Sequence, residues 1–146
     1  MKSKTLILAI GTGLIFLLTQ FNTGAAEHPY YLHALTDLRS ARWMLDHRPG
    51  DWRQTEDERE AVRRIDAAIN EIKRAAIDDG KNLNDHPRVD EIMEHSGRLR
   101  AALGFLEKAR QDVNQEEDNR FADGLKDRAI QHISEAVNRT RKAMRS

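Results

Sequence analysis

Histidine and acidic side chains gather in two stretches of the sequence, at residues 27–33 and 85–95. An acid-His-Pro triplet opens each stretch, and in the second a histidine follows a glutamate by four positions. Imidazole and carboxylate groups are ligands of zinc, copper and nickel, and no thiol competes with them because the chain has no cysteine. As the alternative to a binding or accessory role, the pattern indicates low-capacity transition-metal binding by His28, His86, Glu91 and His95.

A plainer interpretation stays open for each of these histidines. Proline suits the first turn of a helix, so the His-Pro steps at 28–29 and 86–87 also indicate helix starts. His95 falls on an apolar stripe, where a hydrogen-bonded histidine is commoner than a metal ligand. His33 points away from the apolar residues of its segment and is predicted to lie at the surface.

Residues 1–26 have the pattern of an export signal. Lys2 and Lys4 precede an uncharged run over 5–21, and the small residues of NTGAA follow at 22–26. We expect a periplasmic or secreted protein whose mature domain spans 27–146 and has no membrane association after cleavage. An uncleaved membrane anchor is the alternative, since the apolar run is close to the ~20 residues that a span needs.

The cleavage position decides whether a further metal site exists. Cleavage after Ala25 gives a mature chain that begins Ala26-Glu27-His28. A histidine at the third position lets the terminal amine, two amide nitrogens and the imidazole bind Cu²⁺ or Ni²⁺ in a square plane. Cleavage after Ala26 removes this site, and the sequence permits both positions.

Charge balance and motifs exclude several classes of function. The chain has 24 basic and 24 acidic residues, which argues against a nucleic-acid partner. Without cysteine there is no disulfide, thiol nucleophile or covalently bound c-type haem. The sequence also has no nucleophile elbow, phosphate-binding glycine loop or HExxH segment. We therefore predict a non-enzymatic binding or accessory protein, with no resident cofactor, whose partner is a protein or a small ligand.

Apolar residues recur with a helical period in four segments, and no segment favours a strand. Helices are predicted over 29–47, 55–79, 88–113 and 118–144, separated by stretches rich in Pro, Gly, Asn and Asp. Thr55 and Glu58 have the spacing of a capping box at the start of the second helix. The predicted fold class is all-α.

Short loops between four helices favour an antiparallel up-down-up-down bundle. In that arrangement the first and third helices are diagonal neighbours that begin at the same end, so His28, His86 and His95 lie at one end of the bundle. Arg110 and Glu58 are then expected at the other end as a structural ion pair. Trp43 and Trp52 are expected to pack around the first turn of the chain.

Two sequence matches suggest repeated helical hairpins. LRSARWML at 38–45 aligns with LRAALGFL at 99–106, and AINEIKRA at 68–75 aligns with AIQHISEA at 129–136. Both matches have the same separation along the chain, as a duplication requires. Shared amphipathic patterning is the other explanation.

The stretches HPYYLHALTDLRSARWML, IDAAINEIKRAAIDDGKNLNDHP and FADGLKDRAIQHISEA resemble a group of uncharacterised exported bacterial helical proteins. More distantly, AIQHISEAV is similar to repeats of the periplasmic small metal-binding protein, a histidine-rich four-helix bundle. That resemblance implies binding of divalent metals. Its histidines recur at heptad intervals, whereas the six of this chain are irregularly spaced, so no ligand is assigned from it.

Overall fold

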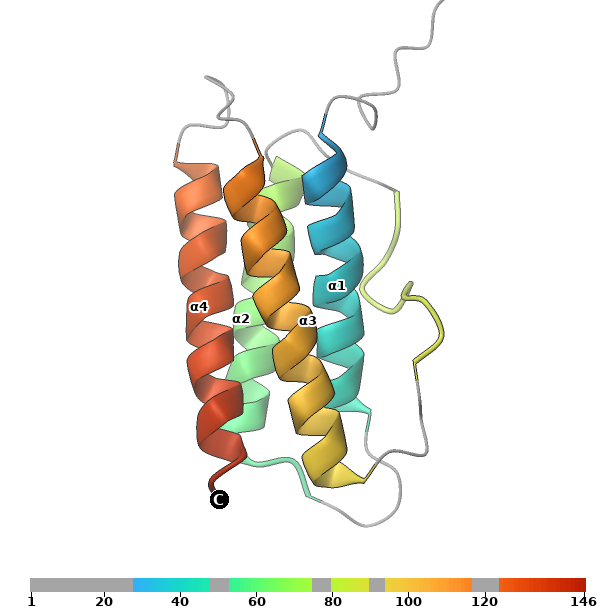
Figure 1. Cartoon of the computed structure of the whole chain (residues 1–146), viewed down its shortest axis with the longest axis vertical. Coiled ribbons are helices and arrows are strands. Elements are labelled where there is room, and N and C mark those ends of the chain that lie inside the picture. The colour runs from blue at the N-terminus through green and yellow to red at the C-terminus, as the bar shows by residue number, and fades with distance from the viewer. Residues whose placement is uncertain (1–27, 48–52, 75–79, 90–93, 117–123) are drawn as a thin grey trace, which may run out of the picture.

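Four helices form the protein in a computed structural model that describes residues 28–47, 53–74, 80–89, 94–116 and 124–146. They are α1 (Pro29–Asp46), α2 (Glu56–Arg74), α3 (His95–Gln115) and α4 (Leu125–Ala143), packed side by side (Figure 1). The described residues contain no strand, so the predicted all-α four-helix bundle is confirmed. None of the helices in these ranges is long and apolar enough to cross a membrane.

Two of the predicted helix starts are confirmed. Pro29 occupies the first turn of α1, where its missing N–H leaves no donor without an intrahelical partner. At the start of α2, the Thr55 N–H donates to Glu58 Oε2 at 2.5 Å, and the Glu58 N–H donates to Thr55 Oγ1 at 3.2 Å. The start at Pro87 is wrong, because α3 begins at His95.

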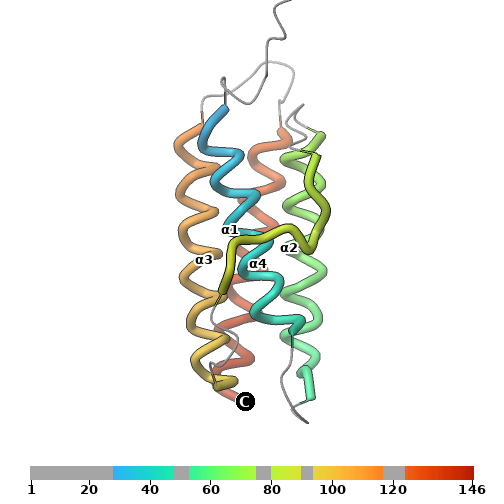
Figure 2. Tube along the Cα trace, turned by 90° about the vertical axis from the view of Figure 1, so that its right-hand side faces the viewer, coloured from blue at the N-terminus to red at the C-terminus, as the bar shows by residue number. Residues whose placement is uncertain are grey.

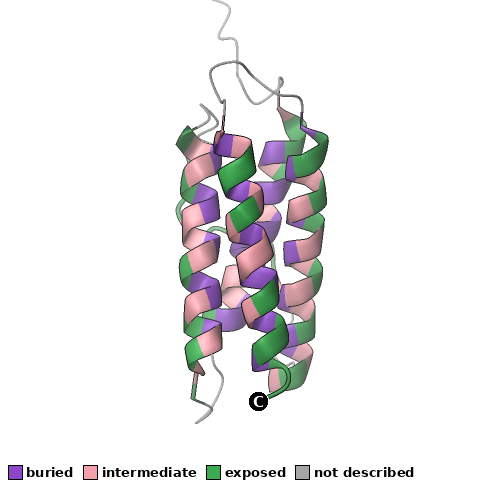
Figure 3. Cartoon of the chain, turned by 90° about the vertical axis from the view of Figure 1, so that its left-hand side faces the viewer, coloured by how far each residue is buried: buried purple, intermediate pink, exposed green. Residues whose placement is uncertain are grey.

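The core runs the length of the bundle on the inward faces of all four helices (Figure 3). Small residues let the helices approach closely, since Ala61, Ala68, Ala129 and Ala136 are fully buried on α2 and α4. The largest fully buried apolar side chains are those of Leu35, Leu38, Leu45, Ile65, Ile69, Ile72, Leu106, Val113 and Ile133. The helical period of the sequence therefore located the buried faces correctly.

The direction of the helices differs from the up-down-up-down prediction. α1 packs against α2 and α3, and α4 packs against the same two helices, so α1 and α4 are diagonal, as are α2 and α3. The first turn of α3 contacts the first turn of α2 through His95 and Glu58, and Arg98 reaches the end of α1 at Trp43. α2 and α3 therefore run in one direction and α1 and α4 in the other (Figure 1).

The long connection between α2 and α3 explains this difference. About twenty residues separate the two helices, and a bundle of this helix length needs only about ten extended residues to run from end to end. Residues 80–89 cross the outer face of α1 as a strap (Figure 2). Leu83 and Val89 of the strap pack against the core, and Lys81 O accepts hydrogen bonds from Arg39 and Lys73.

The two hairpins, α1–α2 and α3–α4, lie against each other with α1 antiparallel to α3 and α2 antiparallel to α4. Positions that match in the sequence alignment occupy the core in both hairpins. The buried matched pairs include Leu38 with Leu99, Leu45 with Leu106, Ala68 with Ala129 and Ile72 with Ile133. Such burial is also what shared amphipathic patterning produces, so duplication stays a prediction.

Candidate functional site

The predicted metal ligands do not lie together. His28 is at the end of the bundle where α3 finishes, and His95 is the first residue of α3. At 1.5 Å per residue, the 21 residues of α3 place them about 30 Å apart. The expectation that they share one end of the bundle is wrong because α3 runs parallel to α2. Glu91 lies outside the described residues.

His28 joins the start of α1 to the end of α3. Its Nδ1–H donates to Glu116 Oε1 at 3.0 Å, and the Tyr31 N–H donates to Glu116 Oε2 at 3.1 Å. The N-cap residue His28 makes no side-chain cap hydrogen bond to α1. The buried Glu116 carboxylate instead accepts the Tyr31 N–H in the first turn of the helix. Lys126 Nζ donates to the Glu116 carbonyl at 2.6 Å and ties α4 to the same point.

His95 makes a comparable contact at the opposite end. Its Nε2–H donates at 2.6 Å to Oε1 of Glu58, whose side chain is fully buried while that of His95 is 37% exposed. The interpretation of His95 as a partly buried, hydrogen-bonded residue is confirmed. The expected Arg110–Glu58 pair is wrong, since Glu58 binds His95 and Thr55, and Arg110 lies toward the other end of α3.

His86 belongs to the strap and packs against Trp43 of α1. The two rings are 4.5 Å apart, and His47 stacks on Trp43 at 3.9 Å with nearly parallel ring planes. The Nδ1 of His86 lies 2.7 Å from the Pro87 carbonyl, to which it donates. Packing of Trp43 next to the turn after α1 is thereby confirmed, and Trp52 lies outside the described residues.

No three His, Asp or Glu side chains within the described ranges are arranged to hold a metal ion. His28, His86 and His95 each have a protein partner of their own, respectively Glu116, the Pro87 carbonyl and Glu58. His33 is exposed, as predicted. The possible copper or nickel site at the mature N-terminus depends on residues 26 and 27, which lie outside the described part.

Electrostatic pairing is extensive on the helix surfaces. Hydrogen bonds from Arg59 and Arg63 lower the pKa of Glu56, and those from Arg63 and Arg64 lower the pKa of Glu60. Burial has the opposite effect on α1, where it raises the pKa of Asp37. The nearby Lys108 ammonium, 3.4 Å away, only partly offsets this effect.

In the sequence, Arg42 falls between Leu38 and Leu45, and Arg110 between Leu106 and Val113, where the helical period favours an apolar residue. The two arginines differ in their partners. Arg42 donates from Nε to Asp66 at 2.8 Å and from Nη1 to Asn84 of the strap at 3.4 Å. Among the arginines of the described ranges, Arg110 alone is partly buried yet has neither a hydrogen bond nor an ion pair. The sequence marks Arg110 as unusual, because it lies on an apolar stripe. It does not show that the guanidinium lacks a hydrogen bond or ion pair.

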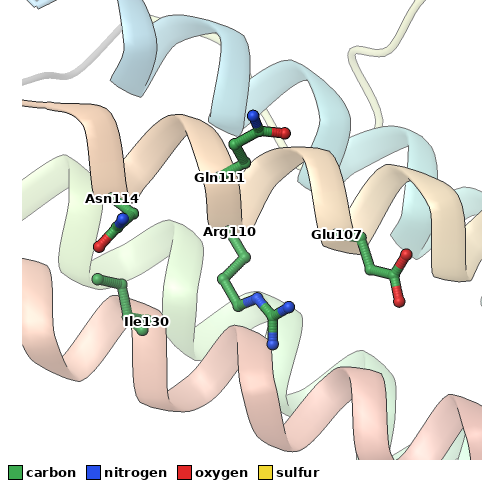
Figure 4. Close-up of a pocket in the computed structure, with 5 residues that line it drawn as sticks. All are labelled: Glu107, Arg110, Gln111, Asn114 and Ile130. Carbon is green, nitrogen blue, oxygen red and sulfur yellow. The ribbon is translucent and has the colours of Figure 1, made fainter.

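Arg110 lies in a groove of about 550 Å³ between α3 and α4. Its guanidinium extends from α3 toward α4, with Ile130 near one end of the groove and Glu107 near the other (Figure 4). Gln111 and Asn114 add two amide side chains to the lining. Arg141 of α4 donates to Glu107 at 2.7 Å, so the one carboxylate of the lining already has a cationic partner.

No protein-family model, curated protein or solved structure matches the chain. The family resemblances of the sequence stay predictions, and the fold rests on the helices and contacts described above.

Proposed function

We propose that this chain is an exported, non-enzymatic binding protein that holds a carboxylate-bearing partner in the groove between α3 and α4. The observation that carries the proposal is the partly buried, unpaired guanidinium of Arg110. A partly buried cation loses some of its hydration, which raises the free energy of the folded protein. A bound anion offsets this loss of hydration.

The lining of the groove suits a carboxylate better than a neutral ligand. A guanidinium presents parallel N–H donors that match the two oxygens of a carboxylate. The Asn114 amide offers a further donor, and Ile130 supplies apolar surface for the carbon chain that bears the carboxylate. The Glu107 carboxylate does not compete for Arg110, since Arg141 binds it.

The export part of the proposal is supported by residues 1–26, with their two lysines, uncharged run and small residues. The intact mass of the protein recovered from the exported fraction tests it. A mass that corresponds to a chain starting at residue 26 or 27 supports cleavage, and the mass of the uncleaved chain contradicts it.

Carboxylate binding is tested by NMR of the arginine Nε–Hε groups during titration with N-acetylglutamate α-amide, which has one carboxylate. We expect a saturable shift of the Arg110 signal with a Kd near 1 mM, which corresponds to about 4 kcal/mol of binding free energy. Arg110→Gln should abolish saturable binding. Arg145→Gln, which removes an exposed and unpaired guanidinium elsewhere, is the matched control and should bind as the wild type does.

Two results would overturn this assignment. One is the absence of any saturable Arg110 shift up to about 10 mM probe, where a site of this affinity is mostly occupied. The other is saturable binding that Arg110→Gln leaves unchanged.

A further inference from the structure

We propose that the natural partner of the groove is an acidic helix with two carboxylates three helical turns apart, which lies along the α3–α4 face and contacts Arg110 and Arg100 together. This inference rests on the proposed carboxylate site at Arg110 and specifies the form of its partner. It begins from a second unpaired arginine on the same helix.

Arg100 lies ten residues before Arg110 in α3, which corresponds to about 15 Å along the helix axis. It has no hydrogen bond or ion pair in the described part of the structure. Helical geometry places the two positions within about 80° of each other around the axis, with Leu103 and Glu107 between them. The two guanidinium groups therefore belong to one face of α3.

A second hollow lies at the Arg100 end of this face. It has a volume of about 200 Å³ and is lined by the first turns of α3, the last residue of α4 and the C-terminal residues after it. Arg100 and Met144 are among its lining residues, and Met144 is one of two large apolar side chains that are exposed in the described ranges. Each hollow thus combines an unpaired guanidinium with apolar surface, Ile130 in one and Met144 in the other.

The charges of the face favour an acidic partner. Glu107, in the lining of the Arg110 groove, pairs with Arg141 through a 2.7 Å contact. Arg100 and Arg110 then remain as cations without a local counter-charge. A partner with two carboxylates would pair with both, and binding at two points gives higher affinity than binding at either alone.

A helix fits this surface better than an extended segment. α3 and α4 lie side by side, and the furrow between two packed helices accepts the side-chain ridge of a third. On a partner helix, residues eleven positions apart lie on one face and about 16 Å from each other. That separation matches the spacing of Arg100 and Arg110 along α3.

The test uses two hydrocarbon-stapled helical peptides of identical composition, each carrying two glutamates. In one the glutamates are eleven positions apart, and in the isomer they are four apart. Fluorescence anisotropy with the purified protein should give about tenfold tighter binding for the eleven-position peptide. Arg100→Gln and Arg110→Gln should each reduce its affinity to that of the isomer, while Arg88→Gln, which makes the same change in charge on the strap over α1, should not.

The outcomes separate this inference from the proposed function. Weaker binding of both peptides to Arg110→Gln, with no effect of Arg100→Gln, overturns the two-point helix and leaves the carboxylate site at Arg110. Equal affinity of the two peptides for the wild type likewise overturns the helix geometry. If neither substitution changes either affinity, both proposals fail.

Discussion

His95 donates a 2.6 Å hydrogen bond to the fully buried carboxylate of Glu58 and so joins the first turn of α3 to the first turn of α2. The same carboxylate accepts the Thr55 N–H, so one side chain both caps α2 and binds the first residue of α3. This contact exists only because α2 and α3 begin at the same end of the bundle.

Glu58→Ala should therefore be strongly destabilising. It removes a helix cap and a charge-assisted hydrogen bond, and we expect the free energy of unfolding in urea to fall by about 2 to 4 kcal/mol. Thr55→Ala removes only one half of the capping box and should cost about 1 kcal/mol. Glu94→Ala changes an exposed glutamate that makes no cap hydrogen bond and serves as the control. A loss for Glu58→Ala no larger than for Glu94→Ala would contradict this account.

The helix directions can be tested by cross-linking, since the chain has no cysteine of its own. Arg139 near the end of α4 donates to Asp57 at the start of α2 at 2.8 Å. Asp57→Cys with Arg139→Cys should therefore cross-link efficiently with a short bismaleimide under native conditions. Asp57→Cys with Lys126→Cys, near the start of α4, should not. An up-down-up-down bundle would reverse the two results.

Arg110→Gln should leave stability almost unchanged, because no intramolecular partner of the guanidinium is lost. We expect a change in the free energy of unfolding within about 0.5 kcal/mol. Arg42→Gln loses the contacts with Asp66 and Asn84 and should cost about 1 kcal/mol. Equal losses for the two variants would mean that Arg110 has a structural role in the folded chain.

The contact of His86 with Trp43 should hold the strap on α1. An aromatic pair of this kind contributes about 1 kcal/mol, so His86→Ala should raise the population of the detached strap about fivefold. Limited digestion with trypsin, which cleaves after the exposed Arg88 of the strap, measures this population. His47→Ala removes the other ring stacked on Trp43 but none of the strap, and its cleavage rate should match that of the wild type. Equal rates for all three proteins would show that the ring contact does not retain the strap.

Asp37 should make the stability depend on pH. Because burial raises its pKa in the folded state, the folded protein binds this proton more tightly than the unfolded chain does. Its contribution to stability therefore decreases as the pH rises from the ordinary aspartate value through the raised one.

Asp37→Asn removes this titration. Relative to the wild type, the variant should gain stability as the pH rises above the ordinary aspartate pKa of about 4, measured as the shift in the urea midpoint. Asp127→Asn, at an exposed position of α4, provides the comparison. Parallel pH profiles for wild type and Asp37→Asn would rule out the expected role of this carboxyl.

The sequence was sufficient to predict features that depend on neighbouring residues. Helical periodicity located the buried positions Leu35 and Ile69, and a three-residue spacing identified the capping box of Thr55 and Glu58. The direction of α3 could not be predicted in this way, because amphipathic periodicity is the same whichever way a helix runs. The strap at 80–89 crosses α1, and α3 begins at the same end of the bundle as α2, so His95 meets Glu58 instead of lying near His28.

The candidate site was predictable only in part, for a related reason. The position of Arg110 on an apolar stripe singled it out in the sequence, but the ion pair with Glu58 expected for it is wrong. Its lack of a counter-charge depends on which helix lies beside α3. α4 is the neighbour of α3 on that side, and its Arg141 donates to Glu107, the carboxylate that lines the same groove.

The crossing strap also has a consequence for how the chain reaches its native state. Because α1 packs closely on α3 and α2 on α4, many core contacts join residues roughly seventy positions apart. Chains dominated by contacts of such separation fold slowly for their size. Distant segments must first come together, which costs chain entropy, before the burial of apolar surface stabilises them. The first hairpin emerging from the ribosome has most of its apolar surface still without a partner. Completion of the core must then wait for synthesis of α3 and α4, so we expect the chain to fold only after most of it has been made.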